Sequence, residues 1–136
     1  MILFKTENEK QEWNDSKLDN RLKFIVYSIS GYVKEKWNVD LTITEVFRIQ
    51  QEQDRVYKDN PEYKISPWLS VHQEWRGIDF RSTDFTNEQI NELLKYINDI
   101  VDYGRIGKNT MICHDVGSGL HLHLQVSYLE QTMLKK

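Results

Sequence analysis

The sequence predicts an α+β fold, in which helices pack on one side of a small, mostly antiparallel sheet. Two segments repeat apolar residues at the spacing of a helix, and several short segments alternate apolar and polar residues as strands do. The last two short segments flank a glycine-rich turn, which is typical of a β-hairpin. With 136 residues, 39% of them hydrophobic, the chain is predicted to form one domain over residues 1–136.

Residues 1–40 are predicted to be an N-terminal helical region. Between about residues 9 and 36, charged side chains fill one face and apolar side chains recur near the helical period on the other: Trp13, Leu18, Leu22, Ile25, Val26 and Ile29. Gly31 lies inside this pattern and is a point where a helix could bend.

Residues 41–128 are predicted to form the core that carries the function. Residues 41–49 alternate β-branched and polar side chains as a strand does, and a short helix or turn and then a loop at 58–67 are expected after it. A strand is predicted at 77–81, and the capping residues at 83–88 open a helix with one apolar stripe, namely Ile90, Leu93, Leu94, Ile97 and Val101. The hairpin consists of strands at 110–114 and 120–128, joined by a tight turn at 116–119.

Composition excludes several classes of protein. The formal net charge is −3, so no surface for nucleic acid is expected. The single cysteine, Cys113, forms no intrachain disulfide and reads as a small apolar strand residue. No apolar run is long enough for a membrane span, and the N-terminus turns polar at Lys5, which is unlike a signal peptide. We therefore expect cytoplasmic synthesis and no membrane insertion, and any action outside the cell would need a separate means of release.

The final strand carries two histidines on one face. Because side chains alternate along a strand, His121, His123 and Gln125 share a face while leucines occupy the other. Two imidazoles placed in this way can bind one metal ion, although a His-x-His on a solvent face is the simpler alternative.

A second strand presents a carboxylate away from its apolar face. Ile78 and Phe80 are expected to point into the core, so Asp79 points the other way, and His72 lies upstream in a loop that can fold back toward it. Together with the His-x-His, these residues can supply three zinc ligands and one further histidine. The His114-Asp115 pair, in the turn before the last strand, could line the cleft, but a solvated turn is the expected role.

At these positions the chain resembles the zinc peptidases that comprise D-alanyl-D-alanine carboxypeptidases, lysostaphin-type endopeptidases and the hedgehog signalling domain. Members typically read Ser-x-His-x-x-Gly-x-Ala-x-Asp, followed by a late His-x-His. Ser70, His72 and Asp79 match this pattern, Gly77 stands at the alanine position, and Trp75 replaces the glycine. The resemblance covers about residues 41–127 and implies a hedgehog/DD-peptidase-like fold.

The resemblance implies a zinc ion held by His72, Asp79 and His123. No glutamate closely precedes His123, so the chain fits the subtype in which the first histidine of the pair, here His121, acts as the base. The resemblance also implies that Arg48, after Phe47, faces a substrate carbonyl or carboxylate.

Several of these residues also have simpler structural interpretations. Arg48 could instead form a surface ion pair with Glu45 or Glu52. Ser70 could contact the substrate or cap a turn, and Trp75 could bind the substrate or pack in the core, as could Trp68. Gln53 and Tyr57 are candidates for supporting the site from behind.

The implied function is a zinc metallopeptidase that cuts a peptide bond in bacterial peptidoglycan stem peptides or cross-links. The small size and the expected lack of a signal peptide suggest a phage endolysin released by a separate partner. One alternative is a non-catalytic zinc-binding module on the same scaffold that binds cell-wall or protein ligands. Another is a structural protein whose histidines bind nothing. The sequence does not indicate the oligomeric state or which bond is cut.

Overall fold

The computed structural model describes residues 1–117, 119–128 and 133–134. Ser118, in the predicted tight turn, lies outside these residues. The elements in chain order are β1 (Ile2–Phe4), α1 (Glu7–Trp13), α2 (Asn20–Trp37), β2 (Leu41–Glu45), α3 (Gln50–Val56), α4 (Pro61–Ile65), the 3₁₀ helix η1 (Val71–Glu74), β3 (Gly77–Arg81), α5 (Asn87–Ile100), β4 (Val101–Asp102), β5 (Met111–His114), β6 (His121–Gln125) and β7 (Met133–Leu134). The predicted α+β class is confirmed.

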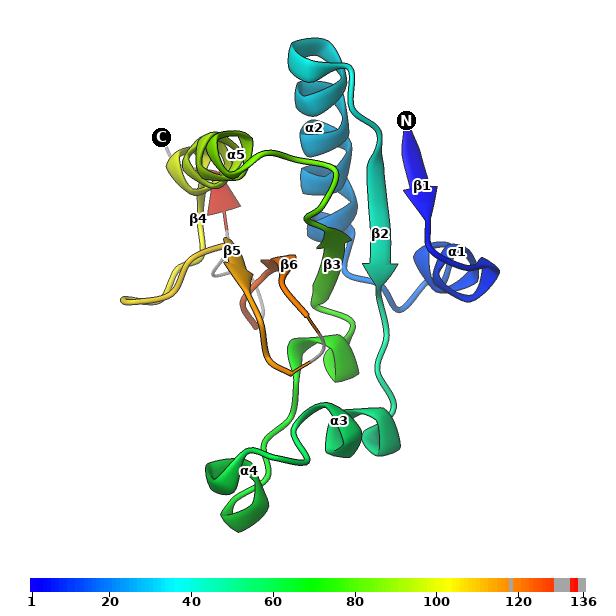
Figure 1. The fold of residues 1–136 in the computed structure, drawn as a ribbon, viewed down its shortest axis with the longest axis vertical. Helices are drawn as coiled ribbons and strands as arrows, with labels where there is room; N and C mark the ends of the chain where they lie inside the picture. The colour runs from blue at the N-terminus through cyan, green and yellow to red at the C-terminus, as the bar shows by residue number, and fades with distance from the viewer. Residues whose placement is uncertain (118, 129–132, 135–136) are drawn as a thin grey trace.

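The central sheet has five strands in the order β1-β2-β3-β6-β5, and only the β1–β2 pair is parallel (Figure 1). The predicted hairpin is confirmed, because β5 and β6 pair antiparallel with Met111 opposite Leu124. A separate small sheet joins β4 to β7. β3 therefore lies at the centre of the main sheet, between β2 and β6.

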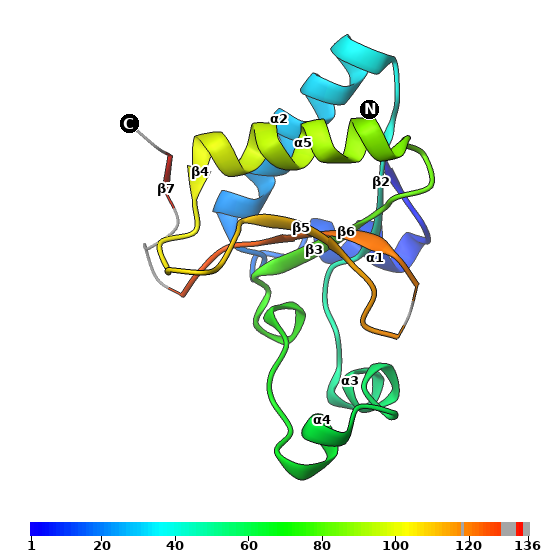
Figure 2. The same ribbon diagram turned by 60° about the vertical axis from the view of Figure 1, so that its left-hand side comes forward.

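Two long helices, α2 and α5, cover the same face of the sheet (Figure 2). Their apolar stripes pack on the inward side chains of the strands, and the core includes Leu22, Ile25, Val26, Ile29, Val33, Ile43, Ile78, Phe80, Leu93, Ile97, Leu122 and Leu124. α5 begins as the capping residues predict, because Thr86 and Gln89 form a reciprocal capping box at its N-terminus.

The opposite face of the sheet meets the shorter helices. η1, α3 and α4 all lie on the side away from α2 and α5 (Figure 2). The prediction of helices on one side thus holds for the two long helices, while this short helical segment crosses to the other face. Part of it, α4, replaces the loop predicted at 58–67; Asn60 caps it by accepting a hydrogen bond from the backbone N–H of Tyr63.

The N-terminal region differs from the single helical segment that the sequence predicts. It begins with the edge strand β1, and the predicted helix is divided into α1 and α2 by residues 14–19. The break follows from capping: Asp19 caps α2 by accepting from the backbone N–H of Arg21. Gly31 lies within α2 and does not interrupt it. None of the helices in the described part of the chain is long and apolar enough to cross a lipid bilayer.

Candidate metal centre

Three elements bring one carboxylate and two imidazoles together on the face opposite α2 and α5. Asp79 of β3 lies directly across from His123 of β6, and η1 places His72 beside them. Asp79 Oδ1 is 3.1 Å from His72 Nε2 and 2.8 Å from His123 Nδ1. All three side chains are buried, with exposed fractions of 2% for His72, 3% for Asp79 and 6% for His123. These are the residues that the resemblance implies as zinc ligands, and they could hold a metal ion.

Local capping fixes the turn that carries His72. Ser70 caps η1: its Oγ accepts from the backbone N–H of His72 at 3.1 Å, and its own N–H donates to the side chain of Gln73. Of the two interpretations of Ser70, the cap is therefore realised. Trp75 ends η1 in the left-handed region at φ 58°, where the resembled family has glycine.

The close approach of η1 to the sheet depends on Gly77. A Cβ atom at this position would lie 2.5 Å from Val71 Cγ2, which is too close for real side chains. His123 Cε1 would be 3.4 Å from the same Cβ. A glycine at 77 therefore lets η1, and with it His72, approach the strand that carries Asp79.

Hydrogen bonds to backbone and amide oxygens fix which nitrogen of each imidazole carries the proton. His72 Nδ1 is 3.1 Å from the carbonyl oxygen of Val46, which can only accept, so Nδ1 donates and Nε2 presents a lone pair to Asp79. Gln125 Nε2 donates to the carbonyl of Asn109, which turns Gln125 Oε1 toward His123 Nε2 at 3.2 Å. His123 Nε2 therefore donates, and its Nδ1 presents a lone pair to Asp79.

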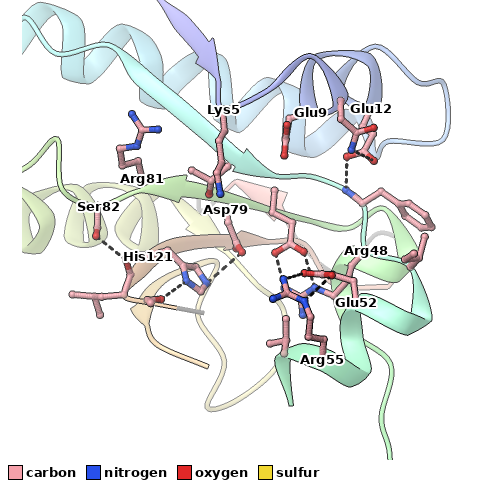
Figure 3. Close-up of a pocket in the computed structure, with 18 of the residues that line it drawn as sticks. Lys5, Glu9, Glu12, Arg48, Glu52, Arg55, Asp79, Arg81, Ser82 and His121 are labelled. Atoms are coloured by element: carbon pink, nitrogen blue, oxygen red, sulfur yellow. Dashed lines mark hydrogen bonds and ion pairs between the residues drawn. The ribbon is translucent and has the colours of Figure 1, made fainter. Parts of the chain in front are cut away.

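In His121, too, an acceptor oxygen fixes which ring nitrogen carries the proton. Its Nδ1 lies 2.8 Å from the carbonyl oxygen of Gly119 and donates to it. Its Nε2 lies 3.3 Å from Asp79 Oδ2, but it is buried and has no hydrogen-bond partner. Figure 3 shows His121 pointing toward Asp79. A lone pair thus faces a carboxylate oxygen, with no proton between them when the imidazole is neutral.

If the three imidazoles carried no extra proton, they and the carboxylate would all present electron pairs to one small volume. Burial makes this arrangement costly unless positive charge lies between the groups, as either a proton or a metal ion. Burial is the largest single influence on the pKa of His72 and lowers it, but the charge and hydrogen bond of Asp79 and the charge of Glu45 together raise the pKa above its ordinary value. Burial alone would raise the pKa of Asp79, but His72 and His123 hold it well below the usual range. Nitrogen and carboxylate donors in this geometry suit zinc.

His114 joins the site, in contrast to the solvated turn expected for it. It pairs with His121 across the hairpin, and its ring centroid lies 4.8 Å from that of His121 and 5.0 Å from that of His123. All four histidines of the chain therefore gather around Asp79. Burial and the neighbouring histidines lower the pKa of His114 to about 4, so it is neutral near pH 7. The sequence signal that pointed toward it is the predicted hairpin, but the register that places His114 opposite His121 is seen only in the structure.

Asp115 keeps the turn role expected of it. Its Oδ1 accepts hydrogen bonds from the backbone N–H groups of Gly117 and Gly119, at 2.8 Å and 3.1 Å. This bonding holds the turn that brings Gly119, and so the hydrogen-bond acceptor of His121, into place.

The guanidinium of Arg48 is bound by other side chains of the protein. Its guanidinium forms a bidentate pair with Glu45, at 2.7 Å and 2.6 Å, and donates to Gln53 Oε1 at 2.8 Å. It is 3% exposed, so the ion pair is buried rather than on the surface. Burial lowers the pKa of Arg48, but Glu45 more than offsets this and raises it above the usual value. Arg48 thus joins β2 to α3 beside the site, and Gln53 supports it from behind.

Trp68 and Trp75 lie in different places. Trp68 lines a pocket with His72, His114, His121 and His123, and it packs edge-on against Tyr57 with ring centroids 5.0 Å apart. Trp75 does not line this pocket. It stacks on Phe47 at 4.6 Å and lines a separate depression, so the structure does not bring this predicted substrate-binding residue to the metal centre.

Comparison of the chain with protein-family models, curated proteins and solved structures gives no match.

Proposed function

We propose that this chain is a zinc metallopeptidase that hydrolyses a peptide bond in bacterial peptidoglycan stem peptides or cross-links. One observation carries the proposal: one ring nitrogen of each of His72, His121 and His123 faces the buried carboxylate of Asp79, while the other ring nitrogen of each donates to an oxygen atom. Only a cation satisfies all of these groups at once. In this proposal His72, Asp79 and His123 bind zinc, and the fold is of the hedgehog/DD-peptidase type.

Zinc held by these residues would lower the pKa of water toward about 7 and polarise a substrate carbonyl. His121 is the general base in this scheme. Gly119 holds its Nδ1 as a donor, so Nε2 is free to take a proton from water and pass it to the leaving amine. Arg48 acts as a positioning residue here, because Glu45 and Gln53 occupy its guanidinium.

The motif resemblance supports peptidoglycan as the substrate. The pocket at the four histidines has an aromatic wall of Tyr57 and Trp68, which suits a short peptide laid across the centre. In this proposal the protein takes part in phage lysis and reaches the wall after release.

The test combines metal analysis with cleavage of purified peptidoglycan. The wild type is expected to bind one zinc ion and to release peptide ends from the wall. His123→Ala should lose both zinc and cleavage, because it removes a ligand. His121→Ala should keep zinc and lose cleavage, because it removes only the base. Circular dichroism of each variant confirms that it is folded.

The outcomes separate the possible functions. Zinc in the wild type without cleavage of any wall preparation would favour a non-catalytic zinc module on this scaffold. No zinc in the wild type after metal addition and dialysis would overturn the metal centre. Full cleavage by His121→Ala would remove this residue from the chemistry.

A further inference from the structure

A second pocket meets the metal centre from the side of α1 and β1. Its cavity of about 730 Å³ is bordered by Asp79 and His121 and also by Lys5, Glu12 and Arg81. Figure 3 shows Lys5 and Arg81 on one side of Asp79, with the group of Arg48, Glu52 and Arg55 on the other. A substrate bound at the metal centre can therefore extend into this pocket.

Most charged groups of this pocket already have a partner within the protein. Arg48 pairs with Glu45, and Arg55 pairs with Glu52. On α1, Glu12 accepts hydrogen bonds from the backbone N–H of Phe47 at 3.3 Å and from the side chain of Asn8 at 3.2 Å. A second α1 carboxylate, that of Glu9, belongs to the capping box of its own helix.

Two positively charged side chains of the pocket have no such partner among the described residues. Across residues 1–117, 119–128 and 133–134, the side chains of Lys5 and Arg81 make no hydrogen bond or ion pair, and both are exposed. Their backbones are nonetheless fixed. Lys5 N–H donates to the carbonyl of Ile43 at 2.9 Å, and Arg81 is the last residue of β3, opposite His121.

The position of Arg81 follows from the strand. Since side chains alternate along β3, Arg81 leaves the sheet on the same face as Asp79, two residues earlier. Its planar guanidinium can bind a carboxylate through two parallel hydrogen bonds, whereas Lys5 supplies a single compact charge. These two side chains therefore offer the free positive charge beside the reacting centre that Arg48 does not.

We propose that Arg81 and Lys5 form a subsite for a free carboxylate of the substrate, on the α1 side of the metal centre. The inference rests on the proposed function and narrows its substrate class to peptides that carry an unamidated carboxylate next to the bond that is cut. Lys5 directly follows β1 and Arg81 ends β3, so both lie outside the motif that carries the family resemblance.

The test compares two acetylated peptides, L-Ala-D-isoglutaminyl-L-Lys-D-Ala with a C-terminal carboxylate and the same peptide with a C-terminal carboxamide. Calorimetric titration of the zinc-loaded protein measures binding, and chromatography of the same mixtures measures cleavage. The wild type should bind the carboxylate peptide more tightly, by a factor of about ten or more for two charge contacts. Arg81→Gln and Lys5→Gln should each reduce this preference about fivefold. Arg105→Gln and Lys10→Gln, which alter exposed cations outside this pocket, are the matched controls and should preserve it.

Each result has a definite meaning. Equal binding of the two peptides by the wild type would overturn the subsite. A preference that persists undiminished in Arg81→Gln and Lys5→Gln would also overturn it, because the carboxylate would then be held by the metal alone. A preference that the two variants reduce, without cleavage of either peptide, would support the subsite and overturn the proposed hydrolysis. Cleavage of both peptides at equal rates and with equal affinities would support the proposed hydrolysis and overturn the subsite.

Discussion

At the middle of β3, the two faces of the central sheet are buried to nearly the same degree but by different means. On the face beneath α2 and α5, Ile78 and Phe80 of β3 are fully buried among apolar side chains. On the opposite face of the same strand, Asp79 is 3% exposed and is surrounded by histidines. Burial alone therefore does not separate core from site. The difference lies in whether each buried group has a partner that satisfies it.

The comparison explains why one face stabilises the fold and the other can bind a ligand. Apolar groups on the first face lose nothing by leaving water, so their packing is complete without any further component. The second face holds the charge of Asp79 and several imidazole nitrogens, and a bound cation would interact favourably with all of them. Mutations on the two faces should therefore act on different quantities, namely stability on one and metal affinity on the other.

The largest expected effect is a loss of stability from a substitution on the apolar face. Phe80→Ala removes a fully buried ring and should lower the free energy of unfolding by about 3–5 kcal/mol. Urea denaturation of the metal-free protein measures it. Phe24→Ala, at a phenylalanine that is 59% exposed on α2, is the control and should change stability by less than about 0.5 kcal/mol. Similar losses in both variants would mean that the apolar face does not dominate stability.

The next largest effect is on zinc affinity, at a residue of the polar face that hydrogen-bonds a proposed ligand. Gln125→Ala removes the oxygen that accepts from His123 Nε2, so the imidazole is no longer held with its lone pair toward Asp79. Zinc affinity should fall about 10- to 100-fold, with little change in stability. Competition with a chromogenic chelator measures the affinity. Gln11→Ala, at an exposed position of α1, should leave it unchanged. An unaltered affinity in Gln125→Ala would show that strand geometry alone orients His123.

Acidity should affect metal binding with a defined sign. The His72 pKa is raised above its ordinary value, so zinc must displace a proton from His72 at mildly acidic pH. Affinity should rise by about tenfold per pH unit below this raised pKa and level off above it. Asp79 does not contribute to this slope, because its pKa is held well below the usual range and it stays ionised.

Chelator competition between about pH 5.5 and 8 tests this expectation. His114, with its pKa lowered to about 4, remains neutral throughout that interval and adds no slope. An affinity that is flat over this interval would mean that no proton is displaced from the ligands.

Alternation along strands is the part of the site that the sequence could predict. In β6 the leucines mark the core face, so the positions of His121 and His123 on the other face follow directly. The same reasoning located Asp79 between Ile78 and Phe80 in β3. Both predictions needed only neighbouring residues on a single strand.

The remaining features depend on contacts between distant segments. His114 enters the site because the register of the hairpin sets it opposite His121, and the sequence of one strand does not fix that register. Glu45 and Gln53 occupy the guanidinium of Arg48, and Gln53 reaches it only because α3 packs beside β2. The edge strand β1 was also missed, since three residues carry too short a pattern to recognise.

The smallest expected effect tests whether one helix cap affects both the stability of the protein and its metal affinity. Ser70→Ala removes the side-chain acceptor for the backbone N–H of His72, and it should cost about 1 kcal/mol of stability. Thr86→Ala removes the equivalent cap of α5, which carries no site residue, and should cost a similar amount. Urea denaturation measures both.

The two cap variants should differ in zinc affinity, which Ser70→Ala lowers and Thr86→Ala leaves unchanged. The reason is that η1 is only four residues long and is itself the support of His72, whereas α5 acts only through the core. Equal affinities in the two variants would mean that the carbonyl of Val46 and the close contact at Gly77 suffice to hold His72. The metal site would then depend on the sheet and not on the turn that delivers its first ligand.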